Sequence, residues 1–257
     1  MTARHLLPSA GIASYVDRIL VIEENQLTTP FILPLYANGV PTILFKSVKG
    51  KIGKQDADHL TLFGQTVLPE FLNLNDNFTL IAYFFKPYSL PTLFGVAAHE
   101  LTDKPIDMNL LFHERSARLQ ERLVNTSGTE NMIALLDKYI LNLINRCKGN
   151  CPLIQYAATA IANDPSKESL HAIQKELYIT ERTFQRLFEK HIGVAPNLYR
   201  RICQFNSAFV QLNKRNHYKL SDIAFQNGYA DQSHYIRSFK EFTNITPTGY
   251  LNYGSEE

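Results

Sequence analysis

The sequence lacks any hydrophobic run long enough to cross a bilayer. Its longest apolar stretches, such as Thr79–Phe85, are far shorter than the roughly 20 residues that a transmembrane helix needs. Residues 1–10 also contain no continuous apolar segment of the kind that a secretion signal requires. We therefore expect an intracellular, cytoplasmic protein that has no membrane partner.

Cysteine is scarce as well, with three residues in a chain of 257. An odd number fits a reducing compartment better than a framework of disulfides. Cys147 and Cys151 lie close together, but a structural zinc site needs four ligands and no second pair follows. The sequence favours two plain thiols in a glycine-containing turn, and we expect neither a metal nor another cofactor.

Motifs of catalysis are also missing. The first hundred residues hold only three scattered histidines, and His99-Glu100 lacks the second histidine of a zinc-protease helix. The chain has no glycine-rich phosphate loop and no Gly-x-Ser-x-Gly turn around a nucleophile. We predict that the protein is not an enzyme and assign no catalytic residue.

Positive charge is concentrated in one part of the chain, although the formal net charge is only +2. Between residues 182 and 219 the only acidic side chain is Glu189. The basic residues in that segment are Arg182, Arg186, Lys190, Arg200, Arg201, Lys214, Arg215 and Lys219. Charge of this density suits contact with phosphate, and from charge alone a solvated helix face is an equal alternative.

The first half of the sequence is β-rich to about residue 88 and helical over 90–147. Segments rich in β-branched and aromatic residues predict strands over Thr42–Val48, His59–Phe63 and Phe78–Phe85. Apolar periodicity predicts helices over Leu90–Leu101, Leu111–Val124 and Thr129–Arg146. The last helix carries an apolar stripe that suits either core packing or a dimer interface.

The second half reads as helices joined by short turns. Ser166 is a good N-cap for a helix over Lys167–Glu176, and Thr180 for a helix over Glu181–His191. Gly193 is suited to end the second of these helices, because glycine adopts the left-handed conformation without steric cost.

A third helix of this half begins at Pro196 and runs to about Leu212, since proline is favoured in a first helical turn. Gly149-Asn150 separates the two halves. We therefore predict an α+β chain with two domains. Residues 1–150 form a β-rich regulatory or dimerisation domain, and residues 152–257 form an all-α domain.

Two segments of the all-α domain are copies of each other at an offset of 51 residues. The matched pairs are Thr180/Asp231, Phe184/Tyr235, Arg186/Arg237, Phe188/Phe239, Gly193/Asn244, Pro196/Pro247 and Tyr199/Tyr250. Such repetition indicates two copies of one supersecondary unit. In each copy a short helix leads through a tight turn into a capped helix, which is helix-turn-helix geometry. Gly228 lies in the second turn, whereas the first turn has no glycine.

The second helix of each copy has an apolar face and a polar face. Spacing predicts burial of Phe184, Leu187, Phe188, Tyr235, Phe239 and Phe242. The polar face carries residue types that contact bases and phosphates. The candidates are Arg182, Gln185 and Arg186 in the first copy, and Gln232, Ser233, His234 and Arg237 in the second. Alternatively, the arginines are partners in salt bridges and the histidine caps its helix.

The stretch IAFQNGYADQSHYIRSFK at 223–240, followed by ITPTGY at 245–250, resembles the second-unit signature of the AraC/XylS family of bacterial transcription regulators. The first unit, over 180–199, is similar to the family's first unit, and the resemblance covers about residues 152–252. It implies a sequence-specific transcription factor. The two sets of candidates would face adjacent major-groove segments of double-stranded DNA, held roughly 34 Å apart by the helix that begins at Pro196.

Residues 93–103, LFGVAAHELTD, resemble a segment in the sensor-like N-terminal domains of some AraC-type regulators. This resemblance implies a small β-domain, with a barrel among its candidate forms, that binds a small-molecule effector or forms a homodimer. The alternative is an N-terminal small-molecule-binding or catalytic domain whose helical tail serves as a protein-interaction module.

Overall fold

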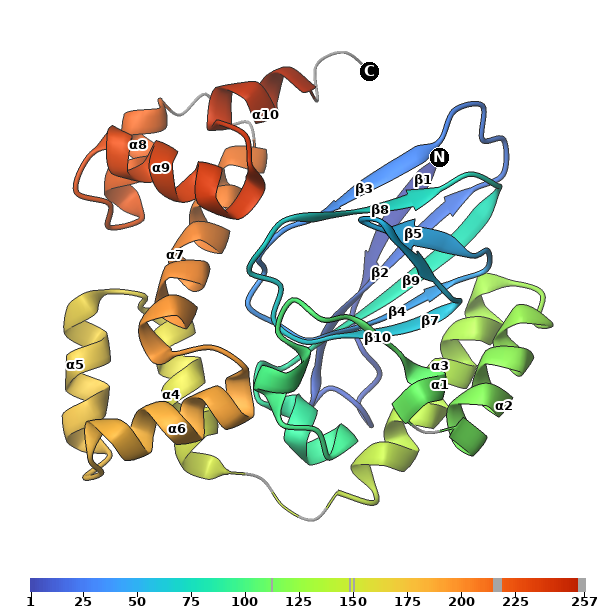
Figure 1. The fold of residues 1–257 in the computed structure, drawn as a ribbon, viewed down its shortest axis with the longest axis horizontal. Coiled ribbons are helices and arrows are strands. Elements are labelled where there is room, and N and C mark those ends of the chain that lie inside the picture. Colours follow the sequence, from blue (N-terminus) through green and yellow to red (C-terminus); the bar gives the residue numbers. More distant parts are fainter. Residues whose placement is uncertain (112, 148, 150, 215–218, 254–257) are drawn as a thin grey trace.

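The computed structural model describes residues 1–111, 113–147, 149, 151–214 and 219–253. Strands occupy the first part of the chain, and helices cover one end of the sheets and make up the second half (Figure 1). Asn150, at the predicted boundary, and Arg215, in the basic segment, lie outside the described residues.

The described strands form two antiparallel sheets, of order β1-β2-β9-β4-β7-β10 and β3-β8-β5-β6. Their bounds are Thr2–Leu6 (β1), Val16–Glu24 (β2), Phe31–Leu35 (β3), Thr42–Lys46 (β4), Gly50–Ile52 (β5), Gln55–Ala57 (β6), Leu60–Phe63 (β7), Glu70–Leu74 (β8), Phe78–Phe85 (β9) and Ile106–Asp107 (β10). Val21 lies opposite Ile81, so the longest pairing joins distant segments. No pairing joins the two sheets among the described residues, and the domain is an open pair of sheets rather than a closed barrel.

Short helices follow the sheets. They are η1 (Leu90–Phe94), η2 (Ala98–Leu101), α1 (Met108–Leu111), α2 (His113–Val124) and α3 (Thr129–Ile144). The prediction of one helix over Leu90–Leu101 was wrong. Gly95 ends η1 in the left-handed conformation, with φ of 68°, and the chain starts again as a 3₁₀ turn at Ala98.

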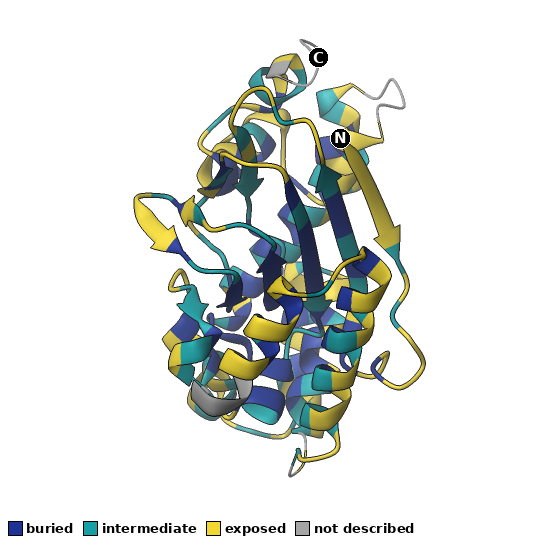
Figure 2. Ribbon diagram, turned by 90° about the vertical axis from the view of Figure 1, so that its right-hand side faces the viewer, coloured by how far each residue is buried: buried dark blue, intermediate teal, exposed yellow. Residues whose placement is uncertain are grey.

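The apolar stripe of α3 belongs to the core. Met132, Leu136 and Ile140 are buried against the first sheet, in one cluster with Tyr83. The Tyr83 hydroxyl donates a hydrogen bond of 2.7 Å to Asp137 on the same helix. Figure 2 shows the central strands buried behind helices whose outer faces are exposed. These three residues of the stripe therefore pack in the core of the β-rich half.

The second half is helical, as predicted. Its elements are α4 (Pro152–Asn163), α5 (Lys167–Glu176), α6 (Glu181–Ile192), α7 (Pro196–Asn213), α8 (Leu220–Gln226), α9 (Gln232–Thr243) and α10 (Pro247–Tyr253). The predicted caps are confirmed, because Ser166 and Thr180 accept hydrogen bonds from the amides of Ser169 and Thr183. Gly193 ends α6 with φ of 104°.

The two halves of the chain touch along α6 and α7. The Thr102 hydroxyl, just after η2, donates a hydrogen bond of 2.7 Å to the Gly193 carbonyl at the end of α6. The rings of Tyr36 and Phe209 of α7 form a T-shaped pair at 5.7 Å between centroids. Ala37 is buried in the core of the helical half. The C-terminal end of α6 is therefore covered by the β-rich half.

Candidate nucleic-acid interface

The α6 helix presents a polar face next to a buried one. Its Thr180 N-cap fixes the start of the helix, and its Gly193 C-cap fixes the end. Phe184 and Phe188 are fully buried and hold the helix against the core, while Leu187 is half-buried. Of the predicted site residues here, Arg182, Gln185 and Arg186 are all exposed. Gln185 donates a hydrogen bond to Glu189 one turn later.

The α9 helix repeats this arrangement. Asp231 caps it by accepting a 2.7 Å hydrogen bond from the His234 amide. Tyr235, Phe239 and Phe242 are buried as predicted. The predicted site residues on this helix, which are Gln232, Ser233, His234 and Arg237, are all exposed. The cap is made by Asp231, and the rings of His234 and Tyr229 form a T-shaped pair at 5.2 Å between centroids.

The salt-bridge alternative for the three predicted site arginines finds no support in the described part of the chain. Arg182, Arg186 and Arg237 have no ion pair there. The basic residue of the segment that does pair is Arg201 on α7, with Glu241 on α9. Their exposure leaves the three arginines available to an external anion.

The long helix α7 joins the two units and fixes both. Arg200 donates hydrogen bonds to the Pro165 carbonyl ahead of α5, at 2.9 Å, and to Gln204, at 3.1 Å. Gln204 in turn donates to the carbonyl of Asn227, in the turn after α8, at 2.9 Å. Burial lowers the pKa of the Arg200 guanidinium. The α7 helix has 18 residues, which corresponds to about 27 Å at 1.5 Å per residue.

The tight turn of each unit contains one residue with positive φ, and that residue differs in type between the two units. Gly228 follows α8 with φ of 71°, and Tyr178 occupies the same place after α5 with φ of 50°. The second turn is one residue longer, since Thr180 caps α6 two residues after Tyr178 and Asp231 caps α9 three residues after Gly228. The missing glycine of the first turn is thus replaced by a strained tyrosine, which sequence reasoning did not identify.

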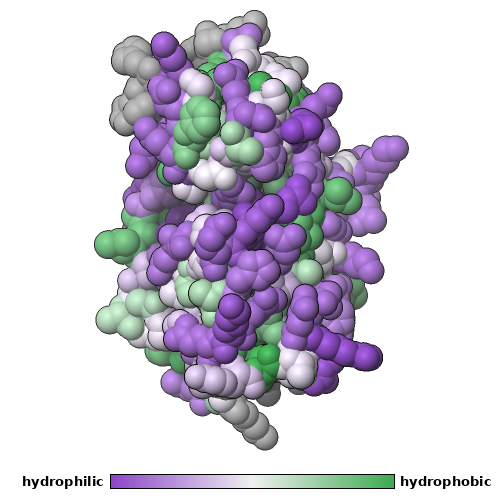
Figure 3. Space-filling model, turned by 90° about the vertical axis from the view of Figure 1, so that its left-hand side faces the viewer, coloured by the Kyte–Doolittle hydropathy of each residue, from purple (hydrophilic) through white to green (hydrophobic). Residues whose placement is uncertain are grey.

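The two sets of predicted site residues remain apart, one on each of the helices that flank α7 (Figure 1). Figure 3 looks onto the helical half and shows a face that is largely hydrophilic, with a few apolar side chains.

Comparison with known proteins decides the nature of this half. A family model described as a helix-turn-helix domain matches residues 173–253. The chain carries a helix-turn-helix domain of the AraC type. A second model, of a domain of unknown function (DUF6597), matches residues 4–107.

An HTH-type transcriptional regulator of Haemophilus influenzae is 25% identical over 146 residues, covering 51% of this chain and 49% of that protein. The matched part therefore spans about half the length of this relative.

Solved structures of ToxT from Vibrio cholerae share the fold. A structure of an apo point variant has a TM-score of 0.52 and 13% identity, covering 91% of this chain and 96% of that one. A second structure has a TM-score of 0.51 over 98% of both chains, also at 13% identity. ToxT bound to an unsaturated fatty acid has a TM-score of 0.50 and 14% identity, covering 90% of this chain and 96% of that one.

A cavity of about 940 Å³ lies between the sheets and the AraC-type domain. Leu44, Leu80 and Ala82 contribute to its apolar wall from the sheet, and Phe209 contributes from α7. Its basic lining residues are His5, Arg18 and Lys214. The Arg18 guanidinium lies 4.3 Å from the centroid of the Phe84 ring, and burial lowers its pKa while Asp17 raises it. No pattern in the sequence indicated this cavity.

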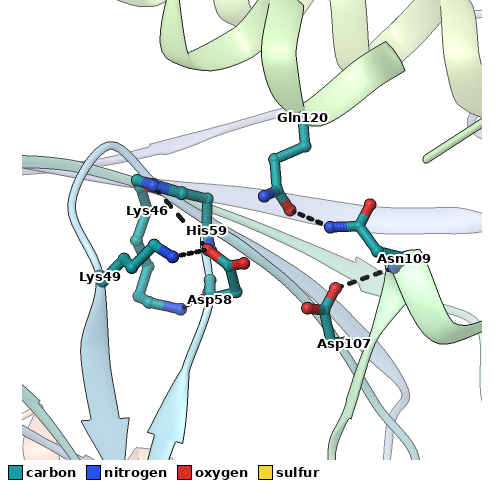
Figure 4. A network of polar contacts seen from close by, with 7 residues as sticks. All are labelled: Lys46, Lys49, Asp58, His59, Asp107, Asn109 and Gln120. Atoms are coloured by element: carbon teal, nitrogen blue, oxygen red, sulfur yellow. Dashed lines mark hydrogen bonds and ion pairs between the residues drawn. The ribbon is translucent and has the colours of Figure 1, made fainter. Parts of the chain in front are cut away.

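A network of polar side chains surrounds Lys46 in the β-rich half (Figure 4). The Lys46 side chain is fully buried, and its ammonium donates a 2.5 Å hydrogen bond to the Asp58 carbonyl. Burial lowers the pKa of Lys46 from 10.5 to about 8, against the opposing effect of Asp58 and Asp107. Asn109 links this region to α2 by donating to Gln120 at 2.9 Å.

The described residues contain no cluster of three or more histidine, cysteine or acidic side chains that could hold a metal ion. Among the helices that they form, none combines the length and the apolar character needed to span a bilayer.

Proposed function

We propose that the chain is a transcription regulator that binds duplex DNA with α6 and α9 in adjacent major-groove segments. The observation that carries this proposal is the pair of capped helices flanking α7. In the described structure α6 carries two exposed arginines without an ion pair, Arg182 and Arg186, and α9 carries one, Arg237. The length of α7, about 27 Å, is comparable to the roughly 34 Å of one DNA turn. Phosphate contacts supply affinity, and the seven exposed site residues predicted on α6 and α9 supply sequence specificity.

The test is duplex binding measured by fluorescence anisotropy at several salt concentrations. Arg186→Ala and Arg237→Ala should each weaken binding by about 1–3 kcal/mol if the arginine reads a base. Arg122→Ala is the matched control, because it removes the same charge from an exposed position on α2. Wild-type affinity in both reading variants would refute the assignment.

We further propose that the cavity holds an effector with an apolar body and an anionic head. Arg18 carries a half-buried positive charge beside Asp17 in a mainly apolar wall, where His5 and Lys214 are the other basic residues. A ligand carboxylate would compensate the cost of burying this charge. The volume of about 940 Å³ suits a ligand of moderate size. ToxT, which shares the fold, binds an unsaturated fatty acid. Because α7 forms part of the wall, such a ligand would contact both halves of the chain.

Thermal unfolding with dodecanoate and dodecylamine tests the effector. The two probes share a tail and differ in the sign of the head group. Dodecanoate at 100 times its Kd should add about 2.7 kcal/mol to the free energy of unfolding, and dodecylamine should add none. Arg18→Met should abolish the gain, whereas Arg4→Met, on the same sheet and outside the cavity lining, should keep it. Equal stabilisation by both probes would exclude an anion-selective site.

A further inference from the structure

Tyr178, in the turn of the first helix-turn-helix unit, has a backbone conformation that is costly for a tyrosine. Its φ is 50°, in the left-handed region, where a side chain with a Cβ meets the following carbonyl oxygen. The other described non-glycine residues with positive φ are Asp103 and Asn244, residue types that tolerate this region. Tyr178 is the exception among the three.

Nothing in the described structure offsets this cost. The Tyr178 side chain is 95% exposed, and the described residues give it no hydrogen bond and no ring partner. The second unit has Gly228 at the same place, with φ of 71°, which is the residue that stability alone would select. Strain that the fold does not repay is typical of a residue with a function outside the fold.

The position of Tyr178 indicates that function. The residue lies two positions before Thr180, the N-cap of α6, and two residues of extended chain span at most roughly 7 Å. A helix that enters a major groove N-terminus first brings the residues just ahead of its cap to the groove wall, where the phosphates lie. Tyrosine hydroxyls are among the groups that contact DNA phosphates.

We propose that Tyr178 is a further DNA-contact residue of the first unit, and that its hydroxyl donates a hydrogen bond to a phosphate beside the groove that α6 enters. The inference rests on the proposed function. It assigns the first turn a contact that the second turn, with glycine, does not make. A contact surface for another protein is the competing use of an exposed tyrosine.

The experiment compares Tyr178→Gly and Tyr178→Phe with wild type in the full chain, by thermal unfolding and by anisotropy with a labelled 30-base-pair duplex. Tyr178→Gly relieves the strain, so its Tm should rise by about 2–4 °C, while its affinity for DNA falls about tenfold. Tyr178→Phe should lose most of the same affinity with an unchanged Tm. Because a neutral hydroxyl releases no counterion, the slope of affinity against salt should stay as in wild type.

Tyr156→Phe is the matched control, since it removes the hydroxyl of another exposed tyrosine in the helical half, on α4. Wild-type affinity in both Tyr178 variants, with binding lost in Arg186→Ala, would overturn this inference and leave the proposed function standing. A lower Tm in Tyr178→Gly would also overturn it, because the tyrosine would then serve the fold. Failure of the wild-type chain to bind duplex DNA would refute the proposed function itself.

Discussion

Gly193→Ala tests whether the β-rich half holds the C-terminal end of α6. A Cβ at Gly193 would lie 2.9 Å from the Thr102 hydroxyl and 3.1 Å from the Ala98 carbonyl oxygen. The Ala98 oxygen is backbone, so η2 must move away from α6 to accommodate the methyl group. The hydrogen bond from Thr102 to the Gly193 carbonyl, now 2.7 Å long, would be lost or lengthened.

Gly95→Ala is the matched control for the magnitude. Gly95 also ends a helical turn with positive φ, and a Cβ there would meet nothing within 4 Å. A left-handed alanine costs about 1–2 kcal/mol, and more at the φ of 104° of Gly193 than at the φ of 68° of Gly95. Both variants gain about 0.4–1 kcal/mol from a less flexible unfolded chain. Only Gly193→Ala adds the steric conflict and the lost hydrogen bond, about 2–3 kcal/mol together.

Differential scanning calorimetry should place the Tm of Gly193→Ala roughly 4–10 °C below that of Gly95→Ala. Hydrogen exchange should become faster over residues 98–102 in the first variant alone, because these amides lie at the contact. Equal Tm values and equal exchange in the two variants would refute the contact between η2 and α6.

Two further predictions concern the β-rich half. Between about pH 8 and 10.5, Lys46 binds fewer protons in the folded state than in the unfolded chain. The free energy of unfolding of the wild type should therefore rise with pH through this window, by on the order of 3 kcal/mol relative to Lys46→Met. Urea titrations at pH 7 and pH 10 check this, and parallel pH profiles of the two proteins would contradict it. Tyr83→Phe should lower the free energy of unfolding by about 2 kcal/mol, because the hydroxyl bonds a carboxylate. Ser9→Ala, which removes an exposed hydrogen bond to the same carboxylate, should cost less than about 0.5 kcal/mol, and an equal effect of the two changes would contradict the role of burial.

The helical half was predictable because its signals are local. Caps, prolines and apolar periodicity placed α5, α6 and α7 within one residue of their observed bounds. The repeat at 51 residues predicted two equivalent units with buried aromatic faces, and the structure buries those faces. The conformation of Tyr178 was not predictable, because left-handed backbone is normally read from glycine or asparagine and neither is present there.

The β-rich half was predicted only in part. Three strands with continuous apolar patterns were found, but β2 was not recognised, although it pairs along its length with β9. Its position depends on a partner about 60 residues away, and no local pattern encodes that pairing. The cavity was missed for the same reason, since its lining residues come from strands of both sheets and from α7.

The most direct test of two reading helices is selection of duplexes from a random pool, followed by spacing variants of the selected site. The account predicts two conserved blocks roughly one helical turn apart, with Arg186→Ala relaxing the choice of base in one block and Arg237→Ala in the other. Insertion of five base pairs between the blocks should abolish specific binding. A single block that both variants alter, or affinity indifferent to the insertion, would contradict it.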